Sequence, residues 1–151
     1  MPVHPLTVHL PIGLAVVLIL LLGGLYIREY GKEVREIILL TFCLFLVSLV
    51  VATITGRGAE TELISHSGER LRNLLRTHEL IAYGAIWANG LLLIWLYLRI
   101  FTWQKTELLM FVFVFALICA GIFYSAHLGG TMVYQERAGV ACRLLNYPVS
   151  R

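Results

Sequence analysis

The residues of this sequence best suited to chemistry are its five histidines: His4, His9, His66, His78 and His127. Neutral imidazole is a common metal ligand and the usual protein ligand of haem iron. Hydrolytic catalysis is not expected, because the chain contains no Asp and its serines lie in loops or in apolar runs. The three dispersed cysteines form no zinc or CxxC motif. We therefore predict cofactor-binding residues and no catalytic residue.

His9 and His78 are the first predicted pair of haem ligands, and His127 and His4 are alternates or ligands of a second haem. A flat macrocycle needs small side chains on the helices that it lies against. Small residues lie one or two helical turns from these histidines: Gly13, Ala82, Ala85, Ala120 and Gly121. Tyr124 lies one turn from His127 and is also predicted beside the haem. Small residues also line helix contacts that hold no cofactor, so a purely structural role stays open. His66 is expected to be structural or at the surface.

Four long apolar segments must position these histidines. The chain has 151 residues, of which 59% are hydrophobic and 14% charged, and its mean hydropathy is +0.82. A water-soluble protein of this size needs more polar surface. The apolar runs are 6–27, 37–55, 78–98 and 108–126, each near the ~20 residues that a membrane-spanning helix needs. The sequence predicts one all-α domain over residues 1–151, an integral membrane four-helix bundle with up-down order.

The connections decide which ends of the spans lie together. Short hairpins follow the first and third spans, whereas residues 56–77 form a longer loop. This loop is predicted to carry a short amphipathic helix on the membrane surface, with Thr77 capping the third span. Up-down order places both termini, this loop and all five histidines at one end of the bundle, which we call the histidine end. The opposite end, with residues 28–36 and 99–107, is the hairpin end.

Polar residues near or inside the spans suggest further roles. A polar side chain at the membrane boundary is costly unless it is paired, which makes the boundary histidines functional candidates. Arg57 and Arg76 flank span ends and are candidates for haem propionates, because Arg binds carboxylates in bidentate fashion. Arg70 and Arg72 suit lipid phosphates at least as well. Asn89, in the middle of a span, is expected to hydrogen-bond across helices.

Charge patterning predicts an orientation and excludes one partner. The net charge of +3 comes from scattered basic residues, without the stripe that binds nucleic acid. The histidine end carries more basic residues, seven against five at the hairpin end, and this count alone favours the histidine end as cytoplasmic. Near the span ends, however, basic residues are denser in the two short hairpins, which favours the hairpin end as cytoplasmic. We expect a multi-pass membrane protein with both termini on the side opposite the cytoplasm. Trp95 and Trp103 are expected in the aromatic belt near the hairpin end.

The motifs of the chain resemble those of a known family. The opening His4-Pro5-Leu-Thr-Val-His9-Leu-Pro11-Ile-Gly13 is similar to the HPxxVHFPIG start of the bacterial membrane-protein family catalogued as domain of unknown function 2231 (DUF2231). Its later signatures resemble Thr55-Gly56, Thr77-His78-Glu79, His127-Leu-Gly-Gly130, Val133-Tyr134 and Gly139-Val140. This chain departs from the pattern at Leu10, where Phe is common, and by inserting Glu136-Arg137-Ala138. The resemblance implies a four-span domain of the bacterial inner membrane, so that the termini are expected on the periplasmic side. Some members join this domain to Rieske or cytochrome domains.

These observations predict a membrane-embedded b-type cytochrome, an electron-transfer subunit and not a stand-alone enzyme. It would pass electrons between a quinone pool or a partner redox subunit and another carrier. The expected cofactors are one or two haem b groups and a quinone, and the expected partners are the lipid bilayer, other redox or membrane subunits, or a second copy. The alternative is a cofactor-free anchor or assembly subunit of a respiratory complex. A transporter or metal-handling protein is a third hypothesis, which the lack of charged or broken helices at the midplane disfavours.

Overall fold

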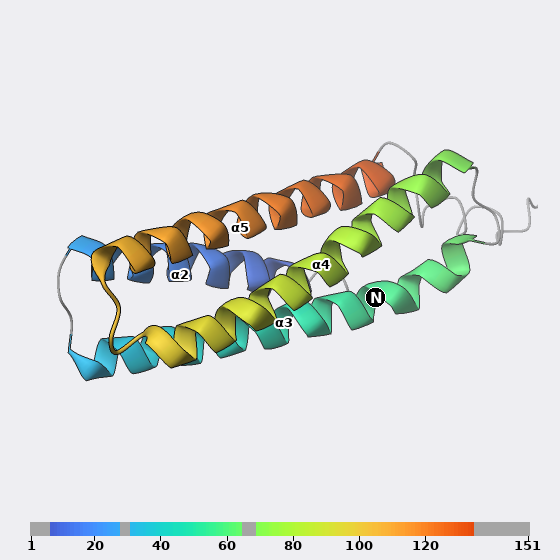
Figure 1. Cartoon of the computed structure of the whole chain (residues 1–151). Coiled ribbons are helices and arrows are strands. Elements are labelled where there is room, and N and C mark those ends of the chain that lie inside the picture. Colours follow the sequence, from blue (N-terminus) through green and yellow to red (C-terminus); the bar gives the residue numbers. More distant parts are fainter. Residues whose placement is uncertain (1–6, 28–30, 65–68, 135–151) are drawn as a thin grey trace, which may run out of the picture.

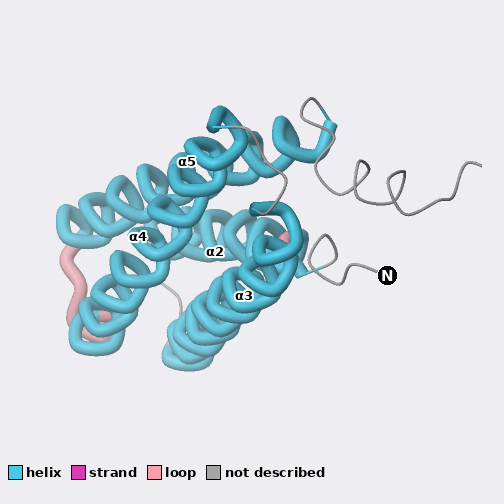
Figure 2. Tube along the Cα trace, turned by 90° about the vertical axis from the view of Figure 1, so that its right-hand side faces the viewer, coloured by secondary structure: helices cyan, strands magenta, loops and turns pink. Residues whose placement is uncertain are grey.

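The computed structural model describes the backbone of residues 7–27, 31–64 and 69–134, and side chains over 7–27, 31–56 and 69–132 (Figure 1). These residues form α2 (His9–Ile27), α3 (Lys32–Ile64), α4 (Glu69–Arg99) and α5 (Lys105–Tyr134). Helices α2 and α4 each pack against both α3 and α5, and Figure 2 shows the helices running alongside one another. The all-α four-helix bundle with up-down order is thereby confirmed.

Each helix contains a segment long and apolar enough to cross a membrane: His9–Ile27, Lys32–Gly56, Glu69–Arg99 and Lys105–Met132. Their outer faces expose large apolar side chains, such as Leu20 at 69% and Trp87 at 76%. In hydrocarbon such outward apolar surface is favourable, and helices satisfy the backbone internally. The chain is therefore a multi-pass membrane protein.

Two helices run well beyond their apolar segments, which corrects the prediction for residues 56–77. The predicted loop with its separate surface helix instead continues α3 to Ile64 and begins α4 at Glu69. The bilayer limits only the apolar run, whereas backbone hydrogen bonds carry a helix on through polar residues of good propensity, such as Glu and Arg. Thr77 consequently lies inside α4 and caps nothing. Its Oγ1 donates to the carbonyl of Asn73 at 2.9 Å.

An aromatic core fills the half of the bundle toward the hairpin end. Its fully buried rings are Phe42, Phe45, Phe111 and Phe115. Their contacting pairs have centroids 5.4 to 6.0 Å apart. Trp95 and Trp103 pack on Phe111 with centroid distances of 5.4 and 4.9 Å. Both tryptophans are half-buried, and their place in an interfacial aromatic belt stays a prediction.

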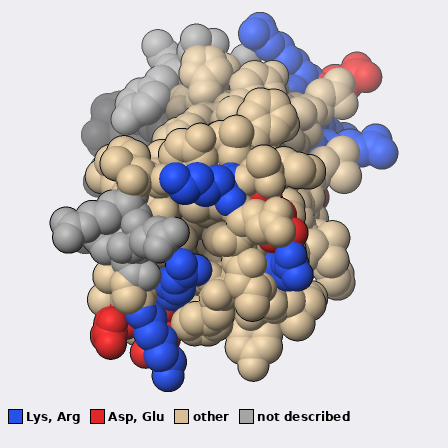
Figure 3. Space-filling model, turned by 60° about the vertical axis from the view of Figure 1, so that its left-hand side comes forward, with Lys and Arg blue, Asp and Glu red and all other residues tan. Residues whose placement is uncertain are grey.

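Polar contacts close the hairpin end. Arg35 of α3 donates to the carbonyl of Ile100, which follows the last turn of α4. Arg99 pairs with Glu107 of α5, with Nη2 and Oε1 2.5 Å apart. Figure 3 brings this end forward and shows Lys and Arg standing out from a mostly uncharged surface. These contacts tie the α4–α5 connection to α3 and fix the register of the three helices.

Candidate functional site

His78 lies between α4 and α5 at the histidine end. Its Nδ1 is 2.9 Å from the main-chain oxygen of Ser125 and 2.8 Å from the Oγ of the same residue. A carbonyl oxygen can only accept a hydrogen bond, so this geometry favours the tautomer with the proton on Nδ1. The other ring nitrogen, Nε2, then carries the lone pair. A backbone carbonyl that fixes the tautomer in this way is the usual support of a metal-ligating histidine.

Small residues on α5 make room for the His78 ring. Ser125 is buried at 6% exposure and presents its short side chain to α4. One turn further, a Cβ added at Gly129 would lie 3.8 Å from Cε1 of His78. The ring is therefore held by Ser125 and lies close to Gly129, which gives it a defined orientation between the helices.

Two of the other predicted histidine ligands, His9 and His127, lie elsewhere at the histidine end. His9 is exposed in the first turn of α2. His127 is exposed on α5, two residues beyond the buried Ser125. His4 and His66 lie outside the described residues. The structure thus places one imidazole inside a helix interface and two on outer surfaces, and the pairing of His9 with His78 stays a prediction.

Within the described part of the chain, no group of three or more His, Cys, Asp or Glu residues could hold a metal ion. This finding bears on a bare metal site, which needs several protein ligands. A haem iron takes its equatorial ligands from the porphyrin and needs only axial ligands from the protein. The result therefore leaves the haem prediction untested.

Open space surrounds several glycines that the sequence suggested as cofactor neighbours. A Cβ added at Gly13 or at Gly121 would meet nothing within 4 Å, and the same holds at Gly84 and Gly130. These glycines are therefore not required for close helix contacts among the described residues. The surface beside them is free to meet lipid or a bound group.

The predicted propionate partners are placed only in part. Arg76 is exposed on α4 at the histidine end, where its guanidinium can reach a carboxylate near the membrane boundary. Arg57 belongs to α3, and its side chain lies outside the described set. Tyr124, predicted beside a haem, is 54% exposed on α5.

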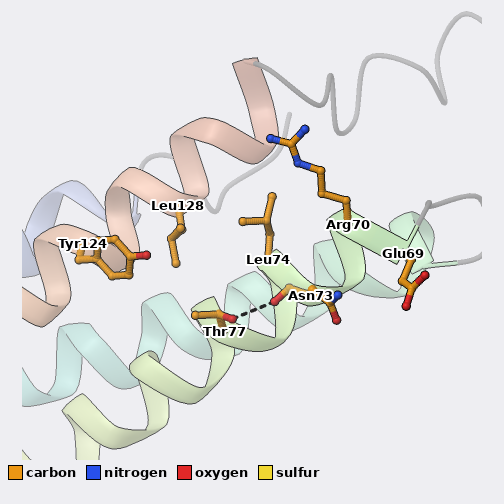
Figure 4. Close-up of a pocket in the computed structure, with 7 residues that line it drawn as sticks. All are labelled: Glu69, Arg70, Asn73, Leu74, Thr77, Tyr124 and Leu128. Atoms are coloured by element: carbon orange, nitrogen blue, oxygen red, sulfur yellow. Dashed lines mark hydrogen bonds between the residues drawn. The ribbon is translucent and has the colours of Figure 1, made fainter.

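A hollow between α4 and α5 was missed by the sequence analysis. It has a volume of about 470 Å³ and is lined by Glu69, Arg70, Asn73, Leu74, Thr77, Tyr124 and Leu128 (Figure 4). The sequence feature that could have indicated the hollow is the spacing of residues 70, 73, 74 and 77, which share one face of a helix. The sequence analysis predicted a helix lying on the membrane surface here, and therefore did not place this face beside α5.

Asn89 is fully buried near the middle of α4. Its Nδ2 donates to the carbonyl of Ala85 at 2.8 Å, within the same helix. Its Oδ1 has no hydrogen-bond partner among the described residues. The prediction of a bond across helices was therefore wrong. The other buried polar side chains among the described residues are Ser48 and Ser125, and their hydroxyls are engaged elsewhere.

Comparison with known proteins supports the membrane assignment. Residues 1–142 match the sequence model of a family described as "Predicted membrane protein (DUF2231)". No curated protein and no solved structure matches the chain. The matched range contains all four apolar helices, including His78 and Ser125.

Proposed function

The chain belongs to the DUF2231 family of predicted membrane proteins, and from this premise we propose that it is a membrane-embedded b-type cytochrome. It passes electrons between a quinone pool or a partner redox subunit and another carrier. The observation that carries the proposal is the contact of His78 Nδ1 with the Ser125 carbonyl at 2.9 Å. This contact leaves Nε2 as a lone-pair donor held in one orientation.

The residues at the histidine end fit a haem in further respects. Gly13 and Gly121 leave open space in which a flat macrocycle can approach the helices. Arg76, and by prediction Arg57, supply guanidinium groups for propionates. When bound, the haem supplies one-electron redox chemistry at its iron. The chain itself would supply an imidazole ligand from His78, an apolar surrounding and a membrane position.

The second axial imidazole is expected from His9, with His127 and His4 as alternates or as ligands of a second haem. His9 begins α2 and His127 lies near the end of α5, so both belong to the same end of the bundle as His78. Single substitutions to Ala distinguish them, because loss of an axial ligand alters the haem spectrum whereas loss of a surface histidine does not.

The test is a reduced-minus-oxidised spectrum and a pyridine haemochrome count on protein purified from membranes. We expect a Soret band in the unchanged protein and its loss in His78→Ala. His66→Ala is the matched control, since it removes a histidine with no predicted cofactor role and should leave the spectrum unchanged. An unchanged protein that contains neither iron nor a Soret band would overturn the proposal.

A cofactor-free anchor or assembly subunit is the second candidate. It is favoured by the outward placement of His9 and His127 and by the bond from His78 to Ser125, which joins α4 and α5 without any ligand. In that case His9→Ala and His78→Ala alter co-purification with partner subunits, and no haem absorbance is present in any variant. The same preparations therefore separate the two functions.

We also propose that the hairpin end lies in the cytoplasm of a bacterial cell and that both termini lie outside it. Lys32, Arg35, Arg99 and Lys105 lie close to helix ends there, as the positive-inside tendency requires. Alkaline phosphatase fused after Arg151 should be active, because this reporter folds outside the cytoplasm. Activity of a cytoplasmic fluorescent reporter at the same position would reverse the orientation.

A further inference from the structure

The hollow between α4 and α5 is apolar at its centre, and its charged residues do not require a charged ligand. Leu74 and Leu128 point toward one another in the middle (Figure 4). The Glu69 carboxylate points away from α5, and Arg70 already takes part in an interaction within the fold. The volume of about 470 Å³ lies in the range of roughly 300–1,000 Å³ that is usual for small-ligand sites. The lining therefore suits a ligand with an uncharged head.

A polar side chain of α5 faces this apolar centre. The hydroxyl of Tyr124 points toward Leu128 and α4 (Figure 4). Among the residues drawn in this close-up, the hydrogen bond runs from Thr77 Oγ1 to the carbonyl of Asn73, at 2.9 Å, so the Tyr124 hydroxyl has no partner within the lining. A hydroxyl group donates one hydrogen bond. The ligand is therefore expected to present an acceptor, such as a carbonyl oxygen, to Tyr124.

The same helix faces continue toward the membrane middle as an open strip. Gly84 lies two turns beyond Thr77 on α4, and Gly121 lies two turns before Leu128 on α5, so both share the faces that form the hollow. The helices are antiparallel, which places both glycines on the membrane side of the hollow. A Cβ at either glycine would meet nothing within 4 Å. This strip can accommodate a single hydrocarbon tail.

The hollow adjoins the contact that holds His78. Thr77 precedes His78 in α4, and Tyr124 precedes Ser125 in α5. Because Nδ1 of His78 is 2.8 Å from the Ser125 Oγ, each of the two helices brings a lining residue next to the proposed haem ligand. A ligand in the hollow is thus bound beside the proposed redox centre.

We propose that the hollow is a quinone-binding site, an inference that rests on the proposed electron-transfer function. One carbonyl oxygen of the quinone ring accepts a hydrogen bond from Tyr124, and the ring lies against Leu74 and Leu128. The isoprenoid tail follows the strip at Gly84 and Gly121. A phospholipid fits less well, because it brings a charged phosphate and two acyl chains to a lining with an apolar centre and one strip. The quinone pool is then one of the two electron partners.

The test uses purified full-length protein in detergent and native mass spectrometry. The probes are a ubiquinone and a menaquinone with short isoprenoid tails, and phosphatidylethanolamine and phosphatidylglycerol are the competing ligands. We expect one of the quinones to bind more tightly than either phospholipid. Tyr124→Phe removes only the hydroxyl and should weaken quinone binding roughly fivefold, as expected for loss of one neutral hydrogen bond. Tyr97→Phe is the matched control, because Tyr97 is 70% exposed on α4 and does not line the hollow.

The tail part of the site has its own pair of variants. Gly121→Leu fills the strip and should weaken binding of the tailed quinones, but not of the same quinone rings without a tail. Gly23→Leu on α2 adds the same side chain at another open position and should change neither. Circular dichroism and gel filtration confirm that each variant is folded.

Two results would overturn the quinone site: a phospholipid that binds more tightly than both quinones, or equal losses of binding in Tyr124→Phe and Tyr97→Phe. The haem spectrum is read separately on the same preparations. A Soret band without quinone binding overturns the quinone site and leaves the cytochrome proposal standing. Quinone binding that depends on Tyr124, in protein without a Soret band, overturns the cytochrome proposal and supports the quinone site.

Discussion

Replacing Asn89 by Leu should stabilise the bundle. The Asn89 side chain is fully buried, and its Oδ1 has no hydrogen-bond partner among the described residues. Burying an unsatisfied polar group costs about 1–3 kcal/mol. The bond that Nδ2 donates to Ala85 contributes about 0.5–1.5 kcal/mol. The Ala85 carbonyl also accepts the regular helical N–H bond, so it keeps a hydrogen-bond donor when the Nδ2 bond is lost. Leu has the same branched arrangement of side-chain heavy atoms as Asn but bulkier methyl groups, whose fit takes up part of the gain. The net gain is therefore about 1 kcal/mol.

Thermal unfolding in detergent, followed by circular dichroism, measures this effect. A gain of about 1 kcal/mol corresponds to a rise in Tm of roughly 2–4 °C for a chain of this size. Ser48→Ala is the control, because the Ser48 hydroxyl is also buried but is satisfied by the carbonyl of Phe45 at 2.7 Å. This control should lower Tm slightly or leave it unchanged. A fall in Tm on Asn89→Leu would refute the argument, since it would mean that Oδ1 accepts a stabilising bond.

Three further predictions concern the core and the hairpin end. Phe115→Ala should lower the free energy of unfolding by about 3–5 kcal/mol, whereas Phe113→Ala should lower it far less, because Phe113 is 63% exposed on the same helix. Equal losses in Tm for the two variants would contradict the observed packing. The half-exposed pair of Arg99 and Glu107 should show a coupling of about 1 kcal/mol or less in a double-mutant cycle, and a larger value would mean stronger desolvation. Arg35→Gln should lower the free energy of unfolding by about 1–2 kcal/mol, because it removes the charge-assisted hydrogen bond to the Ile100 carbonyl at the end of α4. Denaturant unfolding midpoints measure this loss, and an unchanged midpoint would show that the contact does not stabilise the bundle.

Hydropathy alone determined the membrane architecture. A span needs about 20 apolar residues whatever it packs against, so the number and order of the four helices followed from the amino-acid sequence. The same argument placed His78 and His127 at one end of the bundle, because up-down order fixes which span ends meet. Helix bounds were less accessible, since the apolar residues of segment 69–77 are too few for a membrane span and did not show that α4 runs through it without a break.

Only the tertiary structure decided which way the polar side chains face and what they contact. His78 and Ser125 are 47 residues apart, and nothing local to either one predicts their hydrogen bond. Asn89 bonds within its own helix because no free buried partner lies across from it among the described residues. The hollow beside Arg70 likewise exists only because α4 extends outward alongside α5. A hydropathy profile reports how deep in the membrane a residue lies. It does not report direction, because successive side chains point about 100° apart around the helix axis. The neighbouring helices decide which of these side chains are buried in the bundle.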